Sequence, residues 1–293
     1  MNDYKKEFLN IFKELTRSRN TWEVWKDFVD MASYSISNST EYREDIREIR
    51  ELMYGGISKK YGEEDFDRLC RLFATTVLAL DENPAQDFLG EIFMYDLNLG
   101  GNKGQFFTPW HVAELMAEIN TSDNIESEIY EKGYISVNDP ACGSGVLLMA
   151  FANSLKKKNI EYQQNVIFIA QDIDAVVAEM CYIQLTLIGC MGYVVIGNSL
   201  TNPITGDIFF PKYDPPENLL YTPLWWVNGA NLLPYRGRGQ KIIQLKEEST
   251  TTKKTTPIVE QKPQIPKSYL QLNKQQINTE KLKRFFGIKE GRK

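Results

Sequence analysis

A short glycine-containing segment has the residue types and spacing best suited to hold a ligand. Residues 139–145 read Asp-Pro-Ala-Cys-Gly-Ser-Gly, after a strand-like run at residues 134–137 and before a helix-like run at residues 146–155. Glycines let the backbone pass close to a ligand where a Cβ would collide, and the first turn of a helix offers N–H groups to that ligand. The acidic residue at the strand end, Asp139, favours a ligand that carries an ammonium group or hydroxyls.

The spacing of the glycines separates two classes of ligand. Dinucleotide-binding loops usually read Gly-x-Gly-x-x-Gly, and residues 139–145 lack this pattern. A loop that cradles phosphates is therefore the less natural interpretation. S-adenosylmethionine, which has an amino group and ribose hydroxyls, fits the segment better.

Two signatures resemble those of a known enzyme family and occur in the family's order. Residues 139–145 resemble motif I of the N6-adenine DNA methyltransferases, in particular of the modification subunit of type I restriction systems. Residues 104–112 (Gly-Gln-Phe-Phe-Thr-Pro-Trp-His-Val) resemble motif X, whose Phe-Thr-Pro segment closes over the methionine end of the cofactor in that family. The resemblance implies S-adenosylmethionine as the cofactor, and it implies as binding residues Phe107, Thr108, Pro109, Asp139, Pro140, Ala141, Gly143 and Gly145.

The sequence on either side of the two signatures agrees with this resemblance. Residues 86–93 resemble the Asp-x-Leu-Gly-x-x-Tyr-Glu helix that precedes motif X in type I modification subunits. Residues 166–170 predict a buried parallel strand, which brings Asp172 to the strand end where ligands of open α/β sheets bind. We therefore expect Asp172 to contact the ribose hydroxyls. A structural role as the N-cap of a helix at residues 175–188 stays open, although Asp174 suits that cap better.

A third apolar run, residues 193–196, leads into a further candidate cofactor contact. It ends in residues 197–200 (Gly-Asn-Ser-Leu), where the family usually has Gly-Asp-x-Leu. An amide oxygen accepts a hydrogen bond as a carboxylate oxygen does. The resemblance therefore implies that Asn198 contacts the adenine amino group.

The family's motif IV, Asn/Asp-Pro-Pro-aromatic, orients the target base, and its first residue and a backbone carbonyl accept hydrogen bonds from the adenine amino group. The nearest match is Asp214-Pro215-Pro216-Glu217, with glutamate in place of the stacking aromatic. The resemblance implies catalytic roles for Asp214, Pro215 and Pro216, with aromatic residues close by at positions 213, 221, 225 and 226. An Asp-Pro-Pro turn between polar residues is also common in surface loops, and both interpretations stay open.

Composition limits the class of protein. The chain has 293 residues, of which 42% are hydrophobic, with no apolar run long enough to span a bilayer and no basic-then-apolar leader. We therefore expect a cytoplasmic protein that does not enter a membrane. Its four cysteines and His111 lack paired metal-ligand spacing, which predicts neither a metal site nor a disulfide framework. Cys142 has no histidine base available and is interpreted as a small packed residue.

The sequence predicts three parts of different character. Residues 1–100 carry apolar residues at helical spacing in four runs, at residues 4–12, 22–34, 41–54 and 64–80, interrupted by a turn at residues 38–40 and by Gly55-Gly56. Residues 101–235 form the methyltransferase-like cofactor-binding domain. Residues 236–293 hold 15 lysines and arginines against five glutamates and predict a basic, largely disordered tail with a short helix. Such a tail binds DNA in some proteins and is merely solvated in more of them.

The sequence as a whole predicts an α/β fold, a Rossmann-like S-adenosylmethionine-dependent methyltransferase core preceded by a helical amino-terminal domain. The core looks short after motif IV. The implied function is methyl transfer to adenine N6 in DNA, with DNA and a specificity or second methylase subunit as partners. The alternative is a catalytically degenerate protein of the same fold that binds cofactor or DNA beside a partner subunit. RNA or protein as the substrate also stays open.

Overall fold

The computed structural model describes residues 3–101, 105–121 and 124–235, so the tail predicted at residues 236–293 lies outside the described residues. The amino-terminal part is helical: α1 (Asp3–Leu15), α2 (Thr21–Thr40), α3 (Glu44–Ser58), α4 (Glu63–Glu82), α5 (Phe88–Glu91) and a π-helical turn, η1 (Ile92–Asp96). The four predicted helical runs are confirmed. Two predicted interruptions are wrong, because α2 continues through residues 38–40 and α3 continues through Gly55-Gly56.

Aromatic packing explains why these helices hold together. Trp25 is fully buried, and its ring centroid lies 6.0 Å from that of Phe8 and 5.9 Å from that of Phe28. Trp25 is therefore a core residue, while Trp22 is half-buried and packs on Phe93 with ring centroids 6.1 Å apart. Burial of Ile57, which follows the two glycines in α3, offsets their low helix propensity and accounts for the continuous helix.

A mostly parallel sheet forms the centre of the rest of the chain. Strands β1 (Ile135–Asp139), β2 (Val166–Asp172) and β3 (Met191–Ile196) run parallel, and β6 (Leu219–Tyr221) pairs antiparallel with β3, giving the order β1-β2-β3-β6. Among the described residues β1 pairs with β2 alone. The α/β, Rossmann-like fold class is therefore confirmed, with three parallel strands in the described part of the chain.

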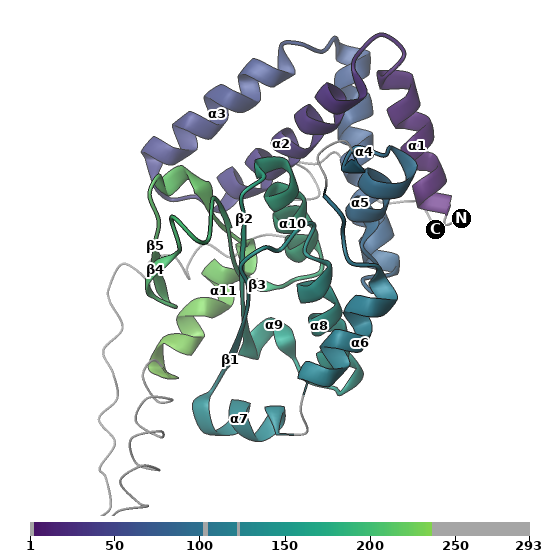
Figure 1. Cartoon of the computed structure of the whole chain (residues 1–293). Coiled ribbons are helices and arrows are strands. Elements are labelled where there is room, and N and C mark those ends of the chain that lie inside the picture. The colour runs from purple at the N-terminus through teal and green to yellow at the C-terminus, as the bar shows by residue number, and fades with distance from the viewer. Residues whose placement is uncertain (1–2, 102–104, 122–123, 236–293) are drawn as a thin grey trace, which may run out of the picture.

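Helices cover both faces of this sheet (Figure 1). On one face lie α8 (Val146–Lys157) and α10 (Ala175–Leu187), and α10 packs in turn against α2 and α4. On the other face lie α11 (Pro223–Leu232) and the hairpin of β4 (Thr205–Asp207) and β5 (Phe210–Lys212). Alternate strand residues supply the two cores: Phe168 and Ala170 face α10, whereas Ile167 belongs to the cluster of Phe209 and Trp225.

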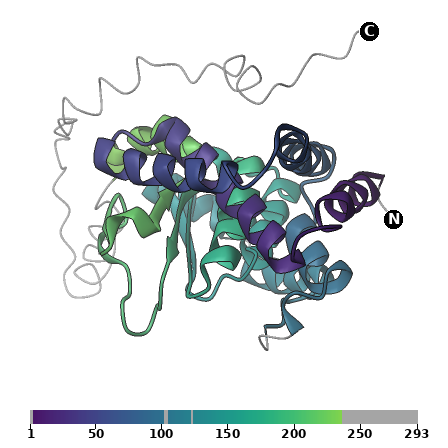
Figure 2. The same cartoon turned by 90° about the horizontal axis from the view of Figure 1, so that it is seen from above.

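The other described helices are α6 (Trp110–Asn120), α7 (Ile125–Lys132), α9 (Tyr162–Asn165), η3 (Pro216–Asn218) and η4 (Leu233–Tyr235). Helix α6 packs on α8. Figure 2 views the molecule from the side where α2 and α3 lie. The boundary predicted at residue 100 stays a prediction. One buried cluster contains residues from both sides of it, from Phe8 to Leu220. No described helix has both the length and the hydropathy needed to cross a membrane.

Candidate cofactor site

The glycine segment forms a tight loop between β1 and α8. Gly143 and Gly145 have φ angles of +56° and +94°, a left-handed conformation that favours glycine. A Cβ on Gly145 would also lie 2.8 Å from Sγ of Cys181, so this position has no room for a side chain. Two hydrogen bonds attach the loop to the end of β2: the Cys142 amide donates to the Gln171 carbonyl (3.0 Å), and the Gly143 amide donates to Oδ2 of Asp172 (2.9 Å).

Two carboxylates stand at this end of the sheet. Asp139 uses Oδ1 to accept the Ala141 amide at 3.1 Å, whereas its buried Oδ2 has no hydrogen-bond partner among the described residues. Burial raises the pKa of Asp139, and the negative charge of Asp172 raises it further, while the Ala141 amide opposes both effects. A buried acceptor without a donor is costly, so Oδ2 is ready for a hydroxyl or ammonium hydrogen from a ligand.

The alternative role of Asp172 as a helix cap is wrong. Asp174 caps α10, with Oδ1 accepting the amides of Val176 (3.1 Å) and Val177 (3.3 Å). Asp172 instead accepts the Asp174 amide through Oδ1 (3.0 Å) and the Gly143 amide through Oδ2. Asp172 therefore holds the glycine loop, and its carboxylate lies beside that loop at the carboxyl end of β2.

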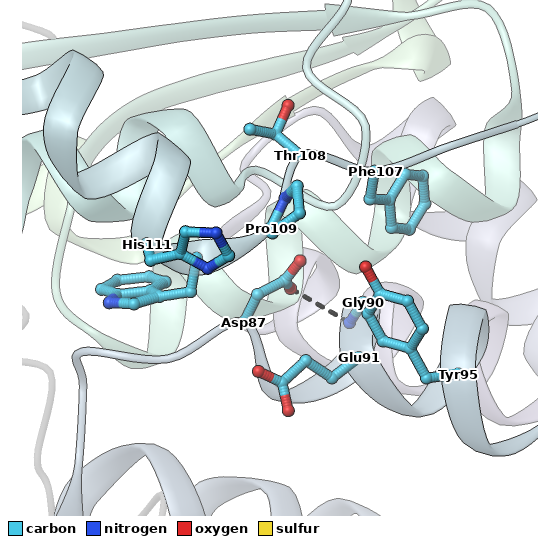
Figure 3. A pocket seen from close by; sticks show the side chains of 9 residues that line it. Asp87, Gly90, Glu91, Tyr95, Phe107, Thr108, Pro109 and His111 are labelled. Atoms are coloured by element: carbon cyan, nitrogen blue, oxygen red, sulfur yellow. Dashed lines mark hydrogen bonds between the residues drawn. The ribbon is translucent and has the colours of Figure 1, made fainter.

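The Phe-Thr-Pro segment lies next to the same loop. A Cβ built on Gly143 would be 3.4 Å from the Phe107 ring, which stacks on Phe93 with centroids 5.6 Å apart. Residues 107–111 line a cavity of about 150 Å³ together with Asp87, Gly90, Glu91 and Tyr95 (Figure 3). Sites for drug-sized ligands usually have roughly 300–1,000 Å³, so this cavity fits only one end of a cofactor. Phe107 is thus brought together with the glycine loop, and Thr108 and Pro109 line the cavity that Phe107 also lines. Pro140 and Ala141 are exposed on that loop.

Asn198 is placed at the end of β3, but its amide oxygen has another use. Oδ1 accepts the backbone amides of Leu200 (2.9 Å) and Thr201 (3.1 Å), which closes a local turn. Both lone pairs of that oxygen are thereby occupied. The sequence argument for Asn198, that its oxygen accepts from the adenine amino group, is therefore not supported, and a contact would have to use its Nδ2 group.

The Asp-Pro-Pro segment lies beyond β3, on the side away from β1. The Asp214 carbonyl accepts Nδ2 of Asn202 (2.8 Å), and the Asn202 carbonyl accepts Nε2 of Gln171 (3.0 Å). Neighbouring strands are about 4.8 Å apart, so β1 and β3 are separated by roughly 10 Å. Asp214, Pro215 and Pro216 are exposed, and hydrogen bonds through Asn202 and Gln171 link Asp214 to the Cys142 amide of the glycine loop.

The aromatic residues near that segment are used in packing. Trp225 is 3% exposed, and its ring lies 5.7 Å from that of Tyr221 and 5.5 Å from that of Tyr193. Trp226 packs on Tyr221 at 4.9 Å. These rings form the core under α11, so they do not replace the missing stacking residue of motif IV.

Sequence reasoning missed Gln184, a fully buried residue of α10 that contacts the glycine loop. Its one signal in the sequence is a polar residue within a helix whose residues are mostly apolar. Cys142 is buried, as its interpretation as a packed residue predicts, and all four cysteines are free. Among the described residues no three His, Cys, Asp or Glu side chains are grouped as metal ligands are.

The parallel sheet and the glycine loop at its carboxyl edge define the class, a Rossmann-like S-adenosylmethionine-dependent methyltransferase. Residues 85–212 match the protein-family model described as N-6 DNA Methylase, which supports the resemblance to the N6-adenine methyltransferases and S-adenosylmethionine as the cofactor. One similar solved structure, from Listeria monocytogenes, has been assigned to the class I S-adenosylmethionine-dependent methyltransferases. It shares 14% sequence identity over 79% of this chain and 71% of that chain, with a TM-score of 0.31. At this score the likeness carries nothing about substrate or site.

The raised pKa of Asp139 predicts how cofactor affinity depends on pH. An ionised carboxylate accepts hydrogen bonds from ammonium and hydroxyl groups, and protonation removes this capacity from one oxygen. Because burial raises the pKa of Asp139, affinity for S-adenosylhomocysteine should begin to fall at a higher pH than the ordinary aspartate value of about 3.9 allows. Calorimetric titrations at a series of pH values measure this, with Asp139→Asn as the variant that should bind weakly and without that pH dependence. An identical pH profile in both proteins would remove Asp139 from the binding site.

Proposed function

We propose that this chain is the cofactor-binding methylase subunit of a DNA adenine-N6 modification system. The observation that carries the proposal is the unpartnered, buried Oδ2 of Asp139 beside a left-handed glycine loop, with Asp172 on the adjacent strand. The match of residues 85–212 to the N-6 DNA methylase model supports DNA as the substrate. A role in restriction-modification, with a specificity or second methylase subunit as partner, belongs to the same proposal.

The residues present fit the cofactor. When bound, S-adenosylmethionine would supply a methyl group on positively charged sulfur, which an amino nitrogen can attack. Asp139 would accept hydrogen bonds from its ammonium or hydroxyl groups, and Asp172 from its ribose hydroxyls. Phe107, Thr108 and Pro109 would cover its methionine end. In this scheme catalysis comes from positioning and electrostatics, without a covalent link to the protein.

The target base needs a second set of groups. In the family's pattern Asp214 and the Pro215 carbonyl would accept hydrogen bonds from the adenine amino group, and Pro216 would shape the turn. Asp214 is exposed and is linked to the glycine loop through Asn202 and Gln171 rather than directly, so the base, this segment or a partner subunit would have to bring it to the reacting group. We therefore expect methyl transfer by the isolated chain to be slow.

A second candidate is a catalytically degenerate subunit that binds cofactor or DNA without transferring a methyl group. It is favoured by the exposed position of Asp214 and by Glu217, which has no ring to stack on a base. The two candidates share the cofactor site. They differ in whether label moves from the cofactor to DNA.

A transfer assay with tritiated S-adenosylmethionine separates the two candidates. On the proposed function, unmethylated DNA gains label as N6-methyladenine, while RNA and protein substrates do not. Asp214→Ala should lower that transfer by about a hundredfold or more, the usual loss when one polar contact to the reacting group is removed, and leave cofactor affinity unchanged. Glu217→Gln is the matched control, because the contact made by Glu217 is through its backbone carbonyl to Arg50.

Three outcomes decide between the candidates. Full activity of Asp214→Ala would make residues 214–217 a surface turn. Label in RNA or protein instead of DNA would contradict the proposed substrate. Absence of label in every substrate, with cofactor binding intact, would favour the degenerate subunit.

A further inference from the structure

A fully buried polar network joins three separate parts of the chain at the glycine loop. Asp87, at the start of α5, is 3% exposed, while Ser144 in the loop and Gln184 on α10 are both 0% exposed. The Ser144 hydroxyl donates to Oδ2 of Asp87 at 2.6 Å, and Nε2 of Gln184 donates to Oδ1 of Asp87 at 2.8 Å. The same Nε2 group donates to the Ser144 carbonyl at 2.9 Å. Ser144 is therefore held through both its side chain and its backbone.

Two backbone amides of the Asp-Phe-Leu-Gly segment, residues 87–90, also belong to this network. The Gly90 amide donates to Oδ1 of Asp87 at 3.0 Å, as drawn in Figure 3, and the Leu89 amide donates to Oε1 of Gln184 at 3.0 Å. A Cβ on Gly90 would overlap the Asp87 carboxylate. Position 90 thus requires glycine for the carboxylate to fold back over the helix start.

A buried carboxylate of this kind is expensive for stability alone. Burial raises the pKa of Asp87, although hydrogen bonds from Gln184, Ser144 and Gly90 lower it in part. Replacing a buried polar network by well-packed apolar side chains is often neutral or stabilising. The polar groups here meet at Ser144, between Gly143 and Gly145, two residues that lack a side chain to restrict the backbone.

We propose that Asp87 and Gln184 are positioning residues, which hold the glycine loop in its cofactor-binding conformation through Ser144. Asp87 also lines the cavity beside Phe107, Thr108 and Pro109, so the network connects the loop with the segment expected to cover the cofactor. The inference rests on the proposed cofactor site and adds to it the groups that order the site before the ligand arrives.

Ser144→Ala tests the inference against a matched control, Ser154→Ala. Ser154 is also a buried serine, and its hydroxyl bonds only to that of Thr121 (2.8 Å), away from the loop. Both variants lose one buried hydroxyl and should lower the thermal midpoint, Ser144→Ala by more because its hydroxyl donates to a carboxylate. Affinity for S-adenosylhomocysteine, measured by calorimetry, should fall about tenfold in Ser144→Ala, the equivalent of one charge-assisted hydrogen bond, and stay unchanged in Ser154→Ala. In the transfer assay Ser144→Ala should raise KM for the cofactor and leave kcat unchanged.

A double-mutant cycle assigns the effect to Asp87. Asp87→Asn alone should weaken binding. Ser144→Ala, which weakens binding in the wild-type protein, should have little further effect in Asp87→Asn, because both changes break the same contact. Ser154→Ala should leave affinity unchanged in both backgrounds. Gln184→Leu removes the donor to both Asp87 and Ser144 at a residue that is not among those lining the cavity, and it carries the test if Asp87→Asn or Ser144→Ala does not fold. Normal affinity in every folded variant would overturn the positioning role and leave the cofactor site standing. Failure of the wild-type protein to bind S-adenosylhomocysteine would overturn both.

Discussion

Replacing Gly143 by valine is expected to weaken S-adenosylhomocysteine binding by about a hundredfold or more while leaving the chain folded. Gly143 has a φ angle of +56°, which a β-branched residue adopts only with strain. A Cβ at this position would already lie 3.4 Å from the Phe107 ring, and the two methyl groups of valine extend further into the space beside the loop. Both effects act on the backbone that approaches the ligand. Equilibrium dialysis with labelled S-adenosylmethionine measures the loss.

Gly133→Val is the control for backbone strain. Gly133 has a φ angle of +84° and ends α7, away from the residues assigned to the cofactor. This variant should lose stability as Gly143→Val does and should bind the cofactor normally. If the two variants weaken binding equally, the effect comes from global destabilisation and Gly143 has no special place in the site.

The largest loss of stability is expected on removing the buried guanidinium of Arg50. Arg50 is 2% exposed, pairs with Glu41 at 3.3 Å and donates to the carbonyls of Glu217 (2.8 Å) and Leu219 (3.3 Å). Arg50 therefore joins α3 to β6. Arg50→Met keeps most of the volume but leaves Glu41 buried with one partner fewer and removes a donor from the carbonyls of Glu217 and Leu219. Breaking a buried pair in this way typically costs about 3–5 kcal/mol of the free energy of unfolding.

Arg47→Met provides the comparison on the same helix. Arg47 pairs with Glu44 at 3.3 Å, and both side chains are largely exposed to solvent. Removing an exposed pair should change the free energy of unfolding by about 0–1 kcal/mol. Urea unfolding of the two variants measures both values. A loss below about 1 kcal/mol in Arg50→Met would show that water or Arg43 replaces the guanidinium.

Local patterns predicted the elements whose sequence determines them directly. Apolar runs identified β1, β2 and β3, helical spacing identified α1 to α4, and the Asp174 cap of α10 followed from its position after β2. These features depend on neighbours within a few residues. Boundaries were less accurate, because burial of Ile57 carries α3 past two glycines that favour a break when considered alone.

Features that depend on distant contacts were not predicted. The hairpin of β4 and β5, strand β6 and helix α11 are short, and tertiary packing against Tyr193 and Trp225 stabilises them. The position of Asp214 follows from the pairing of β6 with β3, which no local motif specifies. Gln184 had no motif at all, since its partners lie 40 and 97 residues away in the sequence.

The central claim, that this chain binds S-adenosylmethionine at the glycine loop, is tested most directly by calorimetric titration of the wild-type protein and Asp139→Ala with S-adenosylhomocysteine. Asp139 is chosen because its buried Oδ2 has no hydrogen-bond donor among the described residues. We expect the wild-type chain to bind one ligand saturably, and a folded Asp139→Ala variant to bind it much more weakly. Absence of saturation in the wild-type protein at millimolar ligand, or equal affinity in the two proteins, would contradict it.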